Sequence, residues 1–278
     1  MTGRLIGDEV AVGDLLQESE LPRHEAMRLV ELASGGSCPD FYLGRLVERE
    51  VAVAFRLLAA SRKRGVPLQY LEGTVQFGPV ELRVDPRALI PRPETEQLWE
   101  LAIEVMGGFI PRVIVDLCTG SGNLALALAH RFPQAEVYGT ELSPDALALA
   151  RENGRELGIK VIWLEGDLFS SLPPRLVRNV DLIVANPPYV SATEWSALPV
   201  DVREHEPEMA LVAGPTGDEI LTRISQEARR WLSPGGFIVC EIAEQRAAQA
   251  VSIFQPFGGI VRRDMAGRPR FTVGSVQP

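Results

Sequence analysis

The chain has 278 residues, of which 46% are hydrophobic and 23% charged, and its formal net charge is −9. This length suffices for one large domain and a small one, and the composition is typical of a soluble globular protein. The acidic balance argues against a protein that wraps duplex nucleic acid, because such a protein gains affinity by neutralising phosphates with Lys and Arg. A local basic groove is still compatible with this charge.

The three cysteines, Cys38, Cys118 and Cys240, are far apart in the sequence. We interpret them as buried free thiols of a reducing compartment rather than as disulfides or metal ligands. The histidines show no ligand spacing, so no metal site is predicted. No apolar run approaches the ~18 residues that a membrane span needs, and the first residues lack the apolar segment of a signal peptide. A cytoplasmic protein with no membrane partner is therefore expected.

Residues 1–73 are predicted to form a small helical domain. Apolar residues recur at helical spacing around residues 12–16, 25–33 and 51–60. The last of these segments is followed by three cations and Gly65, which favour a helix C-terminus. No catalytic signature lies here, so a structural domain and a platform for a protein substrate are both consistent with the pattern.

Residues 74–93 are predicted to form a β-hairpin linker, because alternating apolar residues flank a turn at Gly78-Pro79. The segment that ends the linker, residues 89–96, contains two prolines that favour an extended chain. Thr95 is expected to begin the next helix or to lie in its first turn, with acidic neighbours at the positive helix end.

Residues 94–278 are predicted to form an α/β domain, because strand and helix patterns alternate after residue 112. Buried strands are predicted at residues 113–118, 137–141, 161–164, 181–185 and 237–242. Helices are predicted at residues 124–131, 218–232 and 247–254. A further helix is predicted to begin at the Ser143-Pro144-Asp145 cap. The helix at 218–232 is expected to end at Ser233-Pro234-Gly235-Gly236. Residues 259–273 are predicted to add a final pair of strands around a turn at 267–269.

The chain leaves the fourth predicted strand at Asn186-Pro187-Pro188-Tyr189. Two consecutive prolines cannot extend a central strand, so the backbone must leave the sheet at a carboxyl end, where α/β sheets bind ligands. A planar NH2 group would fit this loop: the Asn186 side-chain oxygen and the Pro187 carbonyl accept its hydrogens, and Tyr189 stacks on its plane. A plain strand-ending turn is the alternative interpretation.

A glycine-rich turn and two acids follow the first three strands of the α/β domain. The turn at residues 116–122 permits close approach of a ligand and exposes N–H groups at a helix start. Glu141 is placed to accept both hydroxyls of a ribose, and Asp167 to accept from an exocyclic amine such as that of adenine. This order of features predicts an S-adenosylmethionine site. A nicotinamide cofactor fits less well, since Ala125 replaces the third glycine, and no P-loop motif is present.

At these residues the chain resembles class I S-adenosylmethionine-dependent methyltransferases that act on planar amino groups, and more narrowly the HemK/PrmC family, the glutamine-N5 methyltransferases of peptide chain release factors. The resemblance covers nearly the whole chain. The matching segments are residues 67–73 (PLQYLEG), 89–96 (LIPRPETE), 116–122 (DLCTGSG), 186–189 (NPPY), 206–213 (EPEMALVA) and 234–236 (PGG). The segment 91–96 is the most family-specific, whereas Asn-Pro-Pro-Tyr also occurs in adenine-N6 enzymes that act on DNA and RNA.

The chain departs from the family pattern at two positions. Cys118 stands where Gly is more usual, and it is small enough to be tolerated. Leu168 stands where some members carry an aromatic residue beside the adenine, and Phe169 is a second candidate for that contact.

The resemblance implies a class I (Rossmann-like) methyltransferase domain with a mainly seven-stranded sheet, preceded by the helical domain and the hairpin linker. It implies transfer of a methyl group from S-adenosyl-L-methionine to the side-chain amide N5 of the glutamine in the Gly-Gly-Gln motif of a release factor. The release factor is the expected partner, with no direct nucleic acid binding, and the enzyme is expected to be a monomer.

The implied site residues fall into three groups. The expected catalytic residues are Asn186, Pro187 and Tyr189. The expected cofactor-binding residues are Asp116, Cys118, Thr119, Gly120, Ser121, Gly122, Glu141, Asp167, Leu168 and Asn186. The expected substrate-binding residues are Asn186, Pro187, Pro188, Tyr189 and Arg92. Arg92 and Phe77 are candidates for the glutamine entrance or for plain structural roles, and Glu206 for a loop cap or a neighbour of the substrate channel.

Three alternatives stay open. An adenine-N6 nucleic-acid methyltransferase would need base flipping and a basic recognition region, which the net charge of −9 and the small helical N-terminal domain disfavour. A glutamine methyltransferase of a ribosomal protein is disfavoured by residues 91–96. A non-catalytic binding module is disfavoured by the intact Asn-Pro-Pro-Tyr sequence and by both cofactor acids.

Overall fold

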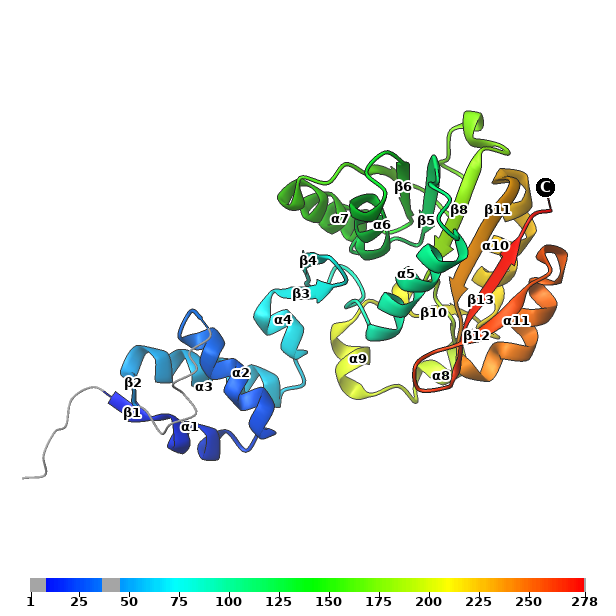
Figure 1. Cartoon of the computed structure of the whole chain (residues 1–278). Coiled ribbons are helices and arrows are strands. Elements are labelled where there is room, and N and C mark those ends of the chain that lie inside the picture. The colour runs from blue at the N-terminus through cyan, green and yellow to red at the C-terminus, as the bar shows by residue number, and fades with distance from the viewer. Residues whose placement is uncertain (1–8, 37–45, 278) are drawn as a thin grey trace, which may run out of the picture. The chain divides into compact units, whose positions relative to one another are not determined.

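The computed structural model describes residues 9–36 and 46–277 (Figure 1), and Cys38 lies outside these ranges. The chain divides into two compact units, Met1–Gly73 and Thr74–Pro278. Each unit has a hydrophobic core of its own.

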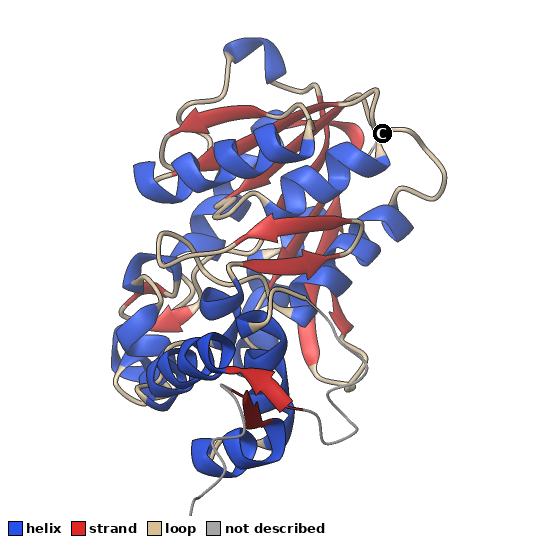
Figure 2. Ribbon diagram, turned by 90° about the vertical axis from the view of Figure 1, so that its left-hand side faces the viewer, coloured by secondary structure: helices blue, strands red, loops and turns tan. Residues whose placement is uncertain are grey.

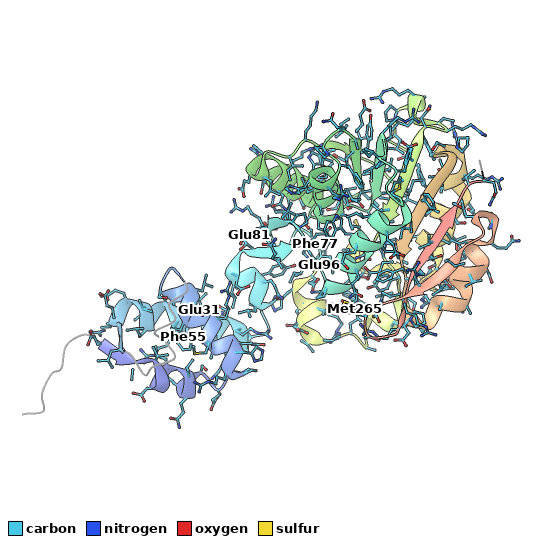
Figure 3. The ribbon with its side chains drawn as sticks, viewed as in Figure 1. Glu31, Phe55, Phe77, Glu81, Glu96 and Met265 are labelled. Carbon is cyan, nitrogen blue, oxygen red and sulfur yellow. The ribbon has the colours of Figure 1, made fainter. Side chains whose placement is uncertain are left out.

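The first unit is mainly helical. Its helices are α1 (Val12–Ser19), α2 (Arg23–Ala33), α3 (Arg49–Lys63) and α4 (Leu68–Glu72). Their apolar faces meet around Leu15, Leu29 and Phe55, which are buried. Figure 3 labels Phe55 among these helices. A short antiparallel pair, β1 (Glu9–Ala11) and β2 (Leu46–Glu48), was not predicted, because strands of three residues are too short to show an alternating pattern.

The predicted hairpin begins the second unit. It consists of β3 (Thr74–Phe77) and β4 (Val80–Arg83), joined through Gly78 at a φ of 48°. Phe77 and Leu82 are fully buried in the same core cluster as Leu98 of helix α5 (Pro93–Val105). The hairpin therefore packs into the core of the second unit.

The second unit is built on a seven-stranded sheet, which confirms the predicted fold class (Figures 1 and 2). Its strands are β5 (Val113–Leu117), β6 (Glu136–Glu141), β7 (Ile162–Glu165), β8 (Val180–Ala185), β11 (Leu232–Glu241), β12 (Ile260–Arg263) and β13 (Pro269–Ser275), in the order β12-β13-β11-β8-β5-β6-β7. Strands β5, β6, β7, β8 and β11 run parallel to one another, and β13 is antiparallel to both β11 and β12. The strand order reverses between β5 and β8, which is where doubly wound sheets bind ligands.

Successive residues of the central strands point to opposite faces of the sheet, and both faces are buried. Ile114 and Leu182 belong to one core cluster, together with α5 and α6 (Asn123–Arg131). Val115 and Ile183 belong to the other, together with α10 (Glu219–Trp231) and α11 (Ala247–Ile253). Burial on both faces explains why these strands read as continuous apolar runs in the sequence.

The second unit differs from the prediction or goes beyond it in two features, and it agrees with the prediction at the start of helix α7. Strand β11 starts at Leu232, directly after α10, and its register against β8 shifts between Leu232 and Phe237. The predicted helix stop at 233–236 is therefore an irregular stretch of strand. Helix α7 (Pro144–Leu157) begins as predicted, with Ser143 as its cap. The short elements β9 (Val190–Ser191), α8 (Ala192–Trp195), α9 (Val200–His205) and β10 (Val212–Gly214) were not predicted.

Candidate active site

A pocket of about 310 Å³ lies where strands β5, β6, β7 and β8 end. This size and position suit a small-molecule cofactor. The predicted cofactor residues that line it are Cys118, Thr119, Gly120, Ser121, Glu141, Asp167, Leu168 and Asn186. Of the predicted substrate residues, Asn186 and Pro188 line it, whereas Pro187, Tyr189 and Arg92 do not.

The glycine-rich turn after β5 brings the backbone to the pocket wall. Gly120 lines the pocket at a φ of 55°, in the left-handed region. Gly122 does not line it; it precedes α6 at a φ of 86°, and a Cβ there would lie 2.8 Å from the Trp163 ring. Gly120 thus serves close approach of a ligand, and Gly122 serves the packing of helix against strand.

Cys118 also adopts a left-handed conformation, with a φ of 56°. A glycine adopts this conformation without strain, which accounts physically for the family's usual Gly at this position. Cys118 and Cys240 are free thiols as predicted; Cys240 is buried, whereas Cys118 lines the pocket and is only partly buried. Burial, and then the neighbouring carboxyls of Glu141 and Asp116, raise the pKa of the Cys118 thiol well above its usual value.

Asp116 lies beneath the glycine-rich turn and does not line the pocket. Its Oδ2 accepts hydrogen bonds from the Thr119 hydroxyl and, at 3.1 Å, from the Ala125 N–H. Its side chain is fully buried, and this burial raises its pKa to about 7. Asp116 therefore ties the turn to the first residues of α6 and positions the groups that do line the pocket.

Glu141 ends strand β6 and lines the pocket. Oε2 accepts from the Gly120 N–H at 2.9 Å, and Oε1 accepts from the Ser143 N–H at 2.9 Å. These two bonds fix the carboxylate and leave each oxygen with a free lone pair. Glu141 is thus a preorganised acceptor for two vicinal hydroxyls.

The residues after β7 form the next part of the wall. Asp167 lines the pocket, and its Oδ2 lies 2.7 Å from Nη2 of Arg223. Leu168 also lines the pocket, whereas Phe169 is buried and stacks on Trp231, with 6.0 Å between the ring centroids. Leu168 and not Phe169 is therefore placed to pack against a bound planar ring.

The Asn-Pro-Pro-Tyr loop is joined to two residues that the sequence analysis did not assign to the site. Asn186 Nδ2 donates to Thr95 Oγ1 at 3.0 Å, and Thr95 Oγ1 donates to Glu241 Oε2 at 2.8 Å. The Tyr189 hydroxyl donates to Glu241 Oε1 at 3.2 Å. Two sequence features could have assigned these residues to the site. Glu241 is a polar residue at the end of the fifth predicted strand, and Thr95 lies in the family-specific segment.

Glu241 is almost completely buried at the end of β11. Burial raises its pKa to about 7, and the opposing influences are the hydrogen bonds from Thr95 and Tyr189 and the charge of Arg270. Burial and the adjacent Glu241 carboxyl also raise the pKa of Tyr189. The Tyr189 hydroxyl is therefore protonated at neutral pH and is a donor in this network.

Arg92 and Glu206 form an ion pair beside the pocket rather than in its wall. The Arg92 guanidinium contacts Glu206 Oε1, and the Ile90 N–H donates to Glu206 Oε2 at 3.4 Å. Glu206 is buried, so this pair joins the segment before α5 to the segment after α9. Phe77 is fully buried in the core, so of its two candidate roles the structure supports the structural one.

Apolar side chains from these two segments complete the pocket. The lining includes Leu89, Pro91, Pro207 and Met209, together with Leu142 after β6. Met209 and Leu142 are 58% and 53% exposed, so the apolar lining continues to the protein surface. The pocket therefore offers polar groups at the strand ends and an apolar surface beside them.

Residues 9–36 and 46–277 contain neither a cluster of metal-binding side chains nor a membrane-spanning helix. No group of three or more His, Cys, Asp or Glu side chains in these ranges is arranged to hold a metal ion. No helix in the same ranges has the length and apolar character needed to cross a membrane.

The fold and the pocket define a methyltransferase domain, and residues 114–205 match the family model described as "Methyltransferase domain". The chain is 43% identical to a release factor glutamine methyltransferase of Mycolicibacterium smegmatis, over 81% of this chain and 80% of the relative. It is 35% identical to one of Rhodopirellula baltica, over 91% of this chain and 88% of that protein. The chain belongs to the release factor glutamine methyltransferase family.

A solved structure supports the fold. A methyltransferase from Pyrococcus furiosus superposes with a TM-score of 0.54 at 16% identity, over 79% of this chain and the whole of that chain.

Proposed function

We propose that this protein transfers the methyl group of S-adenosylmethionine to the side-chain amide nitrogen of the glutamine in a release factor's Gly-Gly-Gln motif. The observation that carries this proposal is the position of Asn186: its carboxamide lies in the wall of the same pocket as the Glu141 carboxylate. A flat amide and a ribose could thus be bound side by side. The names of the relatives support the same substrate class.

The residues present fit the cofactor. Glu141 presents two fixed oxygens to a ribose diol, and Leu168 presents an apolar surface to the adenine. Asp167 is placed to accept from the exocyclic amine, and the turn at Gly120 allows the amino acid part to approach the backbone. When bound, the cofactor supplies a methyl group on a sulfonium, which is an electrophile.

The Asn-Pro-Pro-Tyr loop would hold the substrate amide. An amide nitrogen is a weak nucleophile because its lone pair is delocalised into the carbonyl. Acceptance of its two N–H groups by Asn186 Oδ1 and the Pro187 carbonyl would orient the nitrogen and favour positive charge on it. No base has to remove a proton before attack, because the proton can leave after the methyl group is transferred. Tyr189 acts through its hydrogen bond to Glu241, and Pro188 walls the flat group.

The apolar part of the pocket suits the proposed substrate. Leu89, Pro91, Pro207 and Met209 give the lining an apolar part, and Arg87, a cation that also lines the pocket, is paired with Asp85 and Glu152. Two glycines before the glutamine leave room for a narrow backbone, whereas a flipped adenine nucleotide would bring a phosphate backbone to this apolar surface. The net charge of −9 also disfavours a nucleic acid substrate.

The test is a methylation assay with radiolabelled S-adenosylmethionine and three separate substrates: a purified release factor, the same factor with its motif glutamine replaced by asparagine, and adenine-containing DNA or RNA. We expect label on the unmodified factor alone, and a mass increase of one methyl group on the peptide that contains the motif. Label on nucleic acid, or equal label on both factors, would refute the proposal.

A further inference from the structure

The Asn186 carboxamide has an oxygen end and an NH2 end, and only one of them suits the proposed reaction. Acceptance of a substrate N–H requires Oδ1 to face the pocket. The two ends have nearly the same shape, so packing alone does not select between the two orientations. A hydrogen-bond partner of fixed polarity is needed, and the structure contains one.

The Thr95 hydroxyl supplies that polarity. It has one proton, and it donates this proton to Glu241 Oε2 at 2.8 Å when the Glu241 carboxyl is ionised, which is the dominant form above its raised pKa of about 7. Its oxygen can then only accept a hydrogen bond from the side of Asn186, so the end of the carboxamide that faces it at 3.0 Å must be Nδ2. The opposite end, Oδ1, is left for the pocket.

The three groups come from separate, rigid elements. Thr95 is in the first turn of α5, Glu241 is the last residue of β11, and Asn186 follows β8. Thr95 and Glu241 are 1% and 2% exposed, so water does not compete for their hydrogen bonds. The second Glu241 oxygen is occupied by the Tyr189 hydroxyl at 3.2 Å, which holds the carboxyl in place.

We propose that Thr95 and Glu241 are positioning residues: their hydrogen bonds fix the Asn186 carboxamide with its oxygen toward the substrate amide. This inference rests on the proposed function, since it concerns the orientation of a group in that reaction. It gives the family-specific segment around Thr95 a role within the catalytic site.

The first experiment compares three substitutions in single-turnover methylation of a release factor. Thr95→Val keeps the shape and removes the hydroxyl, Thr95→Ser restores the hydroxyl, and Thr272→Val is the control. Thr272 is also fully buried, but its hydroxyl has no hydrogen-bond partner among residues 9–36 and 46–277. We expect Thr95→Val to lower the methyl-transfer rate at least tenfold, and Thr95→Ser and Thr272→Val to stay within about threefold of wild type.

Binding of S-adenosylhomocysteine separates this effect from a general loss of structure. We expect its dissociation constant to stay within about threefold in all three variants, because the network does not hold the ribose or the adenine. If Thr95→Val does not fold, Thr95→Ala removes the same hydroxyl without a branched side chain. A wild-type rate in the valine or alanine variant, or failure of serine to restore it, would overturn the proposal.

The second experiment does not depend on activity. The chain contains four asparagines, Asn123, Asn153, Asn179 and Asn186, so protein labelled with ¹⁵N-asparagine gives four side-chain NH2 signals by NMR. Asn186→Ala assigns the signal of interest. We expect Thr95→Val to shift the Asn186 signal and speed its hydrogen exchange, while Asn153 and Asn179, which donate to backbone carbonyls elsewhere, stay unchanged.

The two experiments separate the two proposals. If wild-type protein fails to methylate the release factor but the Asn186 signal responds as expected, the proposed function fails and the orientation of the carboxamide stands. If methylation occurs and the Asn186 signal is unchanged in Thr95→Val, the positioning role is refuted.

Discussion

Replacement of Glu141 by glutamine tests the assignment of the ribose site. The carboxylate has two oxygens, and each accepts one backbone N–H at 2.9 Å and keeps a lone pair for a further hydrogen bond. Glutamine has the same size but turns one oxygen into an NH2 donor. That donor cannot accept a ribose hydroxyl, and it faces a backbone N–H that had been a donor to the carboxylate.

The magnitude follows from the lost hydrogen bond. A hydrogen bond to a charged group contributes about 1.5–3 kcal/mol, and every 1.4 kcal/mol is a factor of ten in affinity. Glu141 is half-buried, which favours the lower part of this range. We therefore expect Glu141→Gln to weaken binding of S-adenosylhomocysteine roughly ten- to fortyfold.

Isothermal titration calorimetry with S-adenosylhomocysteine measures this change. The matched control is Glu165→Gln, because Glu165 lies opposite Glu141 at the end of the next strand, is exposed and does not line the pocket. A thermal unfolding curve shows whether the turn at Gly120 survives the substitution. An unchanged dissociation constant in Glu141→Gln, or an equal loss in Glu165→Gln, would show that the ribose does not bind at the end of β6.

Three further predictions concern the turn and the loop. Asn186→Ala should lower the single-turnover rate on the order of 100-fold with near-normal binding of S-adenosylhomocysteine; a wild-type rate would contradict the assignment. Burial raises the pKa of Asp116 from 3.8 to about 7. Between pH 3.8 and about 7 the folded protein therefore keeps a proton on Asp116 that the unfolded protein has released. The free energy of unfolding should consequently fall as the pH rises through this window. Urea unfolding at several pH values should show a shallower fall in Asp116→Asn, and an identical pH profile would disprove the coupling. Gly122→Ala should lower the melting temperature more than Gly120→Ala, because both positions have positive φ but only Gly122 also faces Trp163 at 2.8 Å; equal effects would exclude the packing role.

The fold of the second unit was largely predictable because its strands are buried on both faces. Continuous apolar runs mark β5, β8 and β11, and strong end signals mark helices such as α7, where Ser143 caps and Pro144 follows. Elements of two to four residues, such as β9 and β10, carry too few residues for a periodic pattern. Their pairing depends on contacts between segments about 20 residues apart, which a local pattern does not contain.

The pocket wall was predictable where a residue's place depends only on the strand that it ends. Gly120, Glu141 and Asp167 follow three neighbouring parallel strands, so their common edge follows from the α/β pattern. The direction of each side chain was not predictable in this way. Asp116 turns beneath the loop, and Phe169 turns into the core, because each finds its partners there.

The residues that orient the loop were the hardest to predict, because their contacts are long-range. Thr95 bonds to Asn186 across 91 positions of the chain and to Glu241 across 146. In the sequence, Thr95 reads as a helix-start residue and Glu241 as the polar end of a strand, and both descriptions are correct. Thr95 and Glu241 join one hydrogen-bond network with Asn186 only because α5 packs over the ends of β8 and β11. A loop sequence such as Asn-Pro-Pro-Tyr therefore supplies the groups that touch the substrate, whereas the direction in which they point depends on elements far from it in the chain.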